Sequence, residues 1–106
     1  MADKSFRNFV NGEFVDAAGG ETYDVLDPST GETYAQAALS REEDLDRAYA
    51  AAEAAFPTWG RVTPKERSEA MLKIADALEA RADEFVKAEC KDTGKPLSLT
   101  ASEEMP

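Results

Sequence analysis

The spacing of apolar residues changes near Ser40, and this change limits the fold more than any other feature of the chain. Before that point, short apolar runs alternate with polar residues and are interrupted by Asn-Gly, Gly-Gly and Pro-containing segments, a pattern typical of strands and turns. After it, apolar residues recur every three or four positions, which indicates amphipathic helices. The length of 106 residues suits one small domain. We therefore predict an α+β fold, with a β-hairpin and short strands in residues 1–39 and a helical region in residues 40–106.

Two turns in the first region have specific backbone requirements. Asn11-Gly12 lies between runs rich in Phe and Val, and both residue types tolerate the positive φ angles of a type I′ turn. Such a turn would place Phe9 opposite Phe14 in a hairpin. In the later segment DPSTGE, the carboxylate of Asp27 can cap a second turn. The flanking segments ETYDVL and TYAQAAL are predicted strands.

The first predicted helix starts at Ser40, which forms a capping box with Glu43. Pro57 is expected to end this helix, because proline cannot donate the next helical hydrogen bond. One face of the helix is apolar and carries Leu45, Ala48, Tyr49, Ala52 and Phe56.

A second helix has a stronger start, with Thr63 as N-cap, Pro64 at the first helical position and Glu66 three residues after the cap. Its apolar stripe consists of Met71, Ile74, Ala75 and Leu78. A third helical stretch contains Cys90 and stops at Thr93-Gly94, because glycine favours the left-handed conformation that ends helices. A further helix is expected to begin near Pro96.

The charge and the few reactive residues exclude several function classes. The net charge of −10 repels phosphate polyanions and anionic membrane surfaces, so neither nucleic acid nor a membrane is an expected partner. The chain has no histidine and one cysteine, which excludes an intrachain disulfide and zinc sites built from these residues. No secretory signal pattern or membrane-spanning run occurs, and we expect a cytoplasmic location.

Cys90 is the only thiol that could act as a nucleophile. It lies near a predicted helix C-terminus between Glu89 and Asp92, where the helix dipole and the neighbouring carboxylates disfavour a thiolate. We therefore interpret Cys90 as a small buried residue. Tyr49 and Trp59 could stack on a ligand, but we interpret both as core residues.

The predicted elements, taken in order, resemble the N-terminal segment of the NAD-dependent aldehyde dehydrogenases. The resemblance extends over residues 6–97 and is carried by FVNGEFVDAAGGETYDVLDPSTGE, REEDLDRAYAAAEAAFPTW, TPKERSEAMLKIADALEARADEF and KDTGKPL. The tail LTASEEMP looks similar to the branch that acts on aminoaldehydes such as γ-aminobutyraldehyde, to which the betaine aldehyde dehydrogenases are closely related. The resemblance implies that the chain is part of the α/β, Rossmann-like cofactor domain of a homo-oligomeric enzyme.

In this family, a cysteine within Gly-Gln-x-Cys attacks the aldehyde, hydride passes to NAD, and a glutamate activates the water that releases the acid. Cys90 follows Ala88-Glu89 and does not match that motif, so the catalytic role is not transferred to it. The glutamate and the glycine-bearing turn that holds the cofactor also lie later in family members. The resemblance therefore implies that this chain has no catalytic or cofactor-binding residue and is inactive alone, while the remainder of the enzyme binds NAD.

The resemblance implies two further sites. Related enzymes bind a monovalent cation, K⁺ or Na⁺, and the matching positions are the backbone carbonyls of Val25 and Leu26 and the carboxylate of Asp92. Asp92 could instead brace the turn at Thr93-Gly94. Glu104 matches an acidic position at the substrate entrance, where it would attract an ammonium group. A carboxylate that favours the first turn of a helix is the alternative for Glu104.

The chain stops at ASEEMP without a helix terminator, and we expect the natural protein to continue. Without that remainder, the apolar stripe from Met71 to Leu78 should stay exposed. The alternative is a free-standing, non-catalytic binding or assembly module derived from the same segment.

Overall fold

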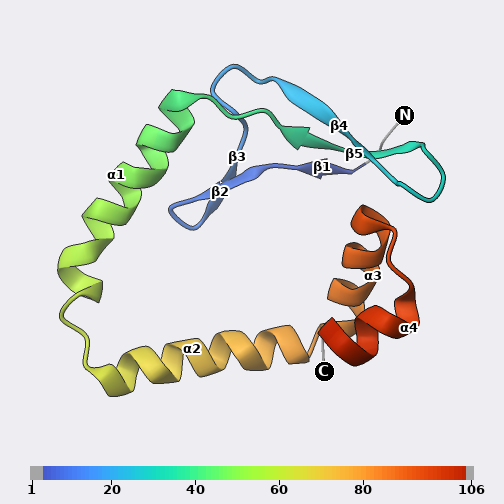
Figure 1. The fold of residues 1–106 in the computed structure, drawn as a ribbon. Coiled ribbons are helices and arrows are strands. Elements are labelled where there is room, and N and C mark those ends of the chain that lie inside the picture. The colour runs from blue at the N-terminus through green and yellow to red at the C-terminus, as the bar shows by residue number, and fades with distance from the viewer. Residues whose placement is uncertain (1–3, 105–106) are drawn as a thin grey trace. The chain divides into compact units, whose positions relative to one another are not determined.

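The computed structural model describes residues 4–104, and strands precede helices along the chain, as the predicted α+β fold requires (Figure 1). The strands are β1 (Ser5–Phe6), β2 (Asn8–Val10), β3 (Glu13–Val15), β4 (Thr22–Leu26) and β5 (Thr33–Ala38). The helices are α1 (Glu42–Trp59), α2 (Pro64–Glu79), α3 (Ala82–Thr93), α4 (Leu97–Leu99) and the π-helix η1 (Thr100–Glu104). No helix among these residues is long and apolar enough to cross a membrane.

The chain forms two compact units that do not follow the boundary between strands and helices. The first unit contains the chain up to Leu26 together with Thr33–Arg61. The second contains the turn Asp27–Glu32 together with the chain from Val62 onward. The strands and α1 thus belong to one unit, and the other helices belong to the second.

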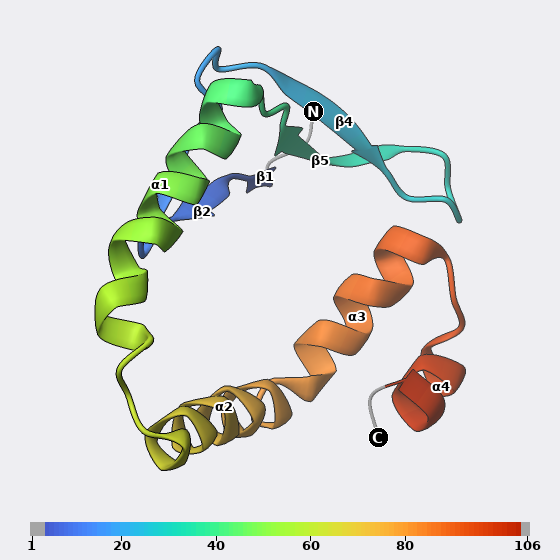
Figure 2. The ribbon, with the colours of Figure 1, turned by 60° about the vertical axis from the view of Figure 1, so that its left-hand side comes forward.

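The first unit holds two small sheets. In the three-stranded sheet, the central strand β5 pairs with β1 in parallel and with β4 in antiparallel orientation. Strands β2 and β3 form a separate antiparallel hairpin. Helix α1 contacts β2, and Figure 2 shows it lying beside this hairpin.

The hairpin confirms the predicted turn. Asn11 and Gly12 have φ angles of 53° and 81°, the positive values that a type I′ turn needs. Phe9 pairs with Phe14 across the strands, with ring centroids 5.1 Å apart and an interplanar angle of 61°. This edge-to-face contact lies within the range that stabilises aromatic pairs.

Helix α1 begins one residue later than predicted, because the Ser40 side chain is engaged elsewhere. Ser40 Oγ accepts a hydrogen bond from Asn8 Nδ2 at 2.8 Å and donates one to Asn8 Oδ1 at 3.1 Å. The N-cap is therefore Arg41, whose backbone N–H donates to Asp44 Oδ2 at 2.8 Å. The predicted capping box of Ser40 and Glu43 is wrong, and Asp44 takes the role assigned to Glu43.

The prediction that Pro57 ends α1 is also wrong. The helix continues through Trp59, and the backbone N–H of Gly60 donates to Phe56 O at 2.7 Å. Proline inside a helix removes one N–H donor and crowds the carbonyl four residues earlier. Because Pro57 lies in the last turn, α1 loses little by including it.

The structure confirms the helix ends that were predicted in the second unit. Thr63 is the N-cap of α2, and its Oγ1 accepts the Glu66 N–H at 3.2 Å. Glu66 Oε2 accepts the Thr63 N–H at 2.7 Å, which completes the predicted capping box. Helix α3 ends at Gly94, which is left-handed with φ of 75°. Helix α4 follows Pro96 and contacts α3.

The described residues contain little apolar core. The buried apolar residues are Ala17, Ala35 and Val86. Tyr49 and Trp59 are 74% and 47% exposed, so their interpretation as core residues is wrong for this structure. The physical reason is that α1 meets β2 through another side, where Asp44 is buried, and leaves its apolar stripe uncovered.

Candidate functional site

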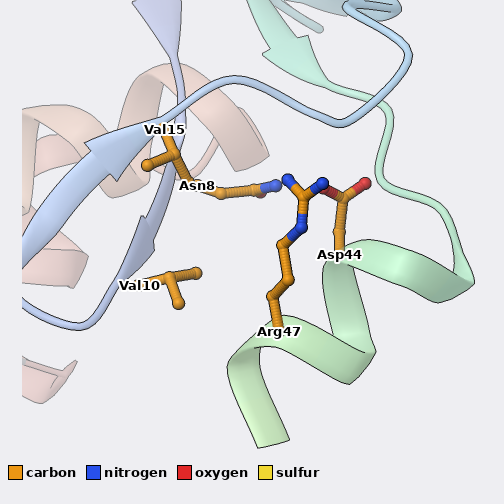
Figure 3. Close-up of a pocket in the computed structure, with 5 residues that line it drawn as sticks. All are labelled: Asn8, Val10, Val15, Asp44 and Arg47. Carbon is orange, nitrogen blue, oxygen red and sulfur yellow. The ribbon is translucent and has the colours of Figure 1, made fainter. Parts of the chain in front are cut away.

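A small pocket of about 110 Å³ lies between the β2–β3 hairpin and the first turns of α1 (Figure 3). Val10 and Val15 come from neighbouring strands and form its apolar wall. Asn8 lies at the start of β2, while Asp44 and Arg47 come from α1. The alternation of side chains along a strand puts Asn8 and Val10 on the same face of the hairpin, toward the helix.

Asp44 is the buried charged residue of this pocket, with 7% of its surface exposed. Its Oδ1 accepts the Ala18 N–H at 2.9 Å, and its Oδ2 accepts the Arg41 N–H at 2.8 Å. A buried carboxylate is tolerated when its oxygens receive hydrogen bonds. Asp44 therefore joins the loop after β3 to the start of α1, and we assign it a structural role. Asp44 was not among the residues predicted to matter, although an aspartate in the first turn of a helix is a recognisable signal.

A larger open depression of about 350 Å³ adjoins the other side of the hairpin and is lined by Ser5, Phe6, Arg7 and Phe14. Its one charged group, Arg7, is paired with Asp16 at 2.7 Å. The other lining residues offer no general base that could activate the Ser5 hydroxyl, so this depression supports no chemical step.

Cys90 lies on α3 and is half-buried, whereas it was predicted to be a small buried residue. Its Sγ donates a hydrogen bond to Thr100 Oγ1 at 3.3 Å, and that hydroxyl donates to Pro96 O at 3.1 Å. Thr100 is fully buried. The thiol thus helps to hold η1 on α3, in accordance with a structural role.

The three predicted cation ligands are divided between the two units. Val25 and Leu26 are paired residues of β4, and an irregularity of the ladder lies between them. Asp92 lies on α3 in the second unit. Neither unit alone contains the predicted cation site, which stays a prediction. Among the side chains that the structure describes, there is also no group of three or more His, Cys, Asp or Glu that could hold a metal ion.

The turn Asp27–Glu32 lies in the same unit as the end of α3. A Cβ added to Gly94 would come within 3.1 Å of Pro28 Cγ, so the turn packs closely on the helix end. The pKa of the Asp27 carboxyl lies below its ordinary value, first because Ser29 Oγ and then because the Ser29 N–H donates to it. The positive charge of Lys91 on α3 lowers this pKa further.

Glu104 is the last residue of η1. Its side chain lies outside the described part of the structure, and its predicted place at a substrate entrance stays a prediction.

The described residues do not fit NAD. The resemblance implies NAD, a dinucleotide of the kind that many α/β folds hold on a glycine-rich turn between a strand and a helix. Here the positive-φ glycines lie at isolated turns, and no G-x-G-x-x-G sequence occurs. The expectation that this chain holds no cofactor-binding residue stays a prediction.

Comparison with known proteins identifies the family. The sequence model described as the aldehyde dehydrogenase family matches residues 14–106. The chain is 39% identical over 104 residues to 2-hydroxymuconic semialdehyde dehydrogenase of Pseudomonas sp. (strain CF600), and 40% identical over 99 residues to 2-aminomuconic semialdehyde dehydrogenase of Danio rerio. These alignments cover 97% and 93% of this chain. The chain belongs to the aldehyde dehydrogenase family.

Solved structures agree with this assignment. The NAD⁺ complex of aldehyde dehydrogenase from Bacillus cereus matches 97% of the chain with a TM-score of 0.92 and 34% sequence identity. PnpE in complex with nicotinamide adenine dinucleotide matches 95% of the chain with the same TM-score and 35% identity. The chain spans 21% and 20% of the length of the two semialdehyde dehydrogenases, about a fifth of each.

Proposed function

We propose that this chain is the N-terminal segment of an NAD-dependent aldehyde dehydrogenase, which oxidises an aldehyde to the carboxylic acid. The observation that carries the proposal is the match to the Bacillus cereus NAD⁺ complex, over 97% of this chain at a TM-score of 0.92. We place the nucleophilic cysteine, the glutamate base and the NAD site in the remainder of the enzyme. The segment itself serves as scaffold for that remainder.

The exposed faces of the helices support the scaffold role. Helix α2 has 16 residues and none of them is buried. Met71, Ile74 and Leu78 form one exposed stripe, while the opposite face carries charged residues such as the Lys65–Glu69 ion pair. An isolated helix of this length is marginal in water and gains its stability from packing of the apolar face. The remainder of the enzyme is the proposed cover for this stripe.

The substrate class is the finer part of the proposal. An aminoaldehyde is supported by the likeness of the tail LTASEEMP to that branch and by the adjacent carboxylates of Glu103 and Glu104, which suit an ammonium-bearing substrate. A semialdehyde is the second candidate, favoured by the names of the muconic semialdehyde dehydrogenases that this chain resembles.

An assay of the full-length protein separates these possibilities. Purified enzyme is mixed with NAD and with γ-aminobutyraldehyde, a semialdehyde or benzaldehyde, and formation of NADH is followed. We expect NADH with an aldehyde present and the highest kcat/KM for the aminoaldehyde. A higher kcat/KM for the semialdehyde would contradict the proposed aminoaldehyde substrate. If none of the three aldehydes yields NADH, the proposed dehydrogenase activity is wrong.

The role of Glu104 has its own test. In the full-length enzyme, Glu104→Gln should raise KM for the aminoaldehyde and leave KM for benzaldehyde unchanged, because only the first substrate carries an ammonium group. An equal change for both aldehydes would argue against a substrate-binding role.

The cation site is tested in crystals of the full-length enzyme grown with a heavier monovalent cation. An anomalous peak bound by the carbonyls of Val25 and Leu26 and the carboxylate of Asp92 is the expected result. Crystals without such a peak would contradict the proposed cation site.

A further inference from the structure

The two asparagines of this chain, Asn8 and Asn11, lie in opposite chemical environments. Asn8 is a half-buried residue of β2, its amide is hydrogen-bonded to Ser40, and the bulky Phe9 follows it. Asn11 lies at the exposed tip of the hairpin and is followed by Gly12. Asparagine is among the thermally labile residues, and its lability depends on how easily the next backbone nitrogen reaches its side chain.

The hairpin tip leaves that approach open. In a two-residue turn the hydrogen bond joins the flanking residues, here Val10 and Glu13, so the turn does not require the Gly12 N–H. Gly12 has no side chain to block the approach, and a Cβ built at this position would find no atom within 4 Å. Glycine also allows the backbone rotation that ring closure needs.

From this juxtaposition we infer that Asn11 is a site of spontaneous deamidation in the native protein. The Gly12 nitrogen forms a bond to Asn11 Cγ, and the side-chain nitrogen leaves as ammonia together with the Gly12 proton. The product is a five-membered succinimide. Water then opens either of its two C–N bonds, so that one ammonia is released and one water consumed overall.

The two products differ in their effect on the hairpin. Opening of the bond between the Gly12 nitrogen and Cγ gives aspartate, which tolerates the positive φ of a type I′ turn as asparagine does. Opening of the bond to the Asn11 carbonyl carbon gives isoaspartate, which adds a methylene carbon to the backbone. Since the register of a hairpin is fixed by its loop length, isoaspartate disrupts the pairing of Phe9 with Phe14.

The test is a time course on the full-length protein, incubated folded at mildly alkaline pH and analysed by peptide mass mapping. We expect Asn11 to lose its amide at least about tenfold faster than Asn8, which serves as the internal control. Endoproteinase cleavage before aspartate but not before isoaspartate distinguishes the two products. Equal rates at the two asparagines, or loss of the Asn11 amide only after unfolding in urea, would overturn the inference.

Two variants test the consequence for the hairpin. Asn11→Gly keeps the positive φ and removes the reactive amide, while Asn11→Asp imitates the harmless product. After incubation, amides of β2 and β3 in the unmodified sequence should exchange with solvent faster than those of Asn11→Gly. If incubation changes the amide exchange rates of both proteins equally, deamidation of Asn11 does not disrupt the hairpin.

Discussion

Asp44 connects the start of α1 to the loop after β3 through two backbone N–H groups, those of Arg41 and Ala18. A partly buried donor that loses its partner costs about 1–3 kcal/mol. Asp44→Ala should therefore lower the free energy of unfolding of the first unit by about 2 kcal/mol, measured by amide hydrogen exchange in the full-length protein.

The matched control is Asp46→Ala, because Asp46 is an exposed acidic residue of the same helix. It should have little effect on exchange. Asp44→Asn should also destabilise the unit, since an amide presents only one oxygen to the two donors. Equal effects of the Asp44 and Asp46 substitutions would contradict the assigned role.

Thr63 and Glu66 hold the start of α2 by reciprocal hydrogen bonds. Loss of a threonine N-cap costs about 1 kcal/mol, so Thr63→Ala should speed exchange of the first-turn amides of α2 about fivefold. Ser68→Ala, within the same helix, removes a hydroxyl of similar size and should not speed exchange. Unchanged protection in Thr63→Ala would show that tertiary packing, and not the cap, fixes this end.

The Asp27 turn should respond to acid. Its carboxylate is held by Ser29, which lowers the pKa of Asp27. A carboxyl whose pKa is lower in the folded state contributes stability above its unfolded pKa, and this contribution is lost as the pH falls through the folded pKa. Carboxyl titration by NMR should place the Asp27 pKa below that of an ordinary aspartate, and Ser29→Ala should raise it. An unchanged pKa in Ser29→Ala would refute the stated cause.

At the scale of secondary-structure elements, the sequence predicted the turns and helix ends that depend on a few neighbouring residues. Asn11-Gly12 defined the hairpin turn, Thr63 and Glu66 defined the start of α2, and Gly94 ended α3. Each of these signals acts over a few residues, and the structure confirms them. The strands on both sides of the DPSTGE turn are confirmed for the same reason.

Long-range contacts explain the errors. Asn8 is hydrogen-bonded to Ser40 although the two residues lie 32 positions apart in the sequence. Ser40 therefore does not cap α1, and Arg41 is the N-cap. A contact over this separation cannot be predicted from the residues next to Ser40. The exposure of Tyr49 likewise depends on which side of α1 meets β2. For the cation site, Val25, Leu26 and Asp92 were implied by the family resemblance, and the site stays a prediction because these residues belong to two different units.

At the scale of the whole molecule, the described residues bury little apolar surface while large side chains on α1 and α2 stay exposed. A chain with so small a core should not fold cooperatively by itself. We expect the isolated 106-residue chain to associate or to melt over a broad temperature range, as measured by circular dichroism and sedimentation velocity. A sharp unfolding transition of a monomer would favour the free-standing module.

The central claim is that this segment functions as part of a longer aldehyde dehydrogenase. The most direct test is the intact mass of the protein as its natural source produces it, captured with an antibody against residues 1–106. Since the chain spans about a fifth of its relatives, we predict a mass several times 11.5 kDa. A natural product of 11.5 kDa would contradict the claim and leave the family assignment as a statement of ancestry alone.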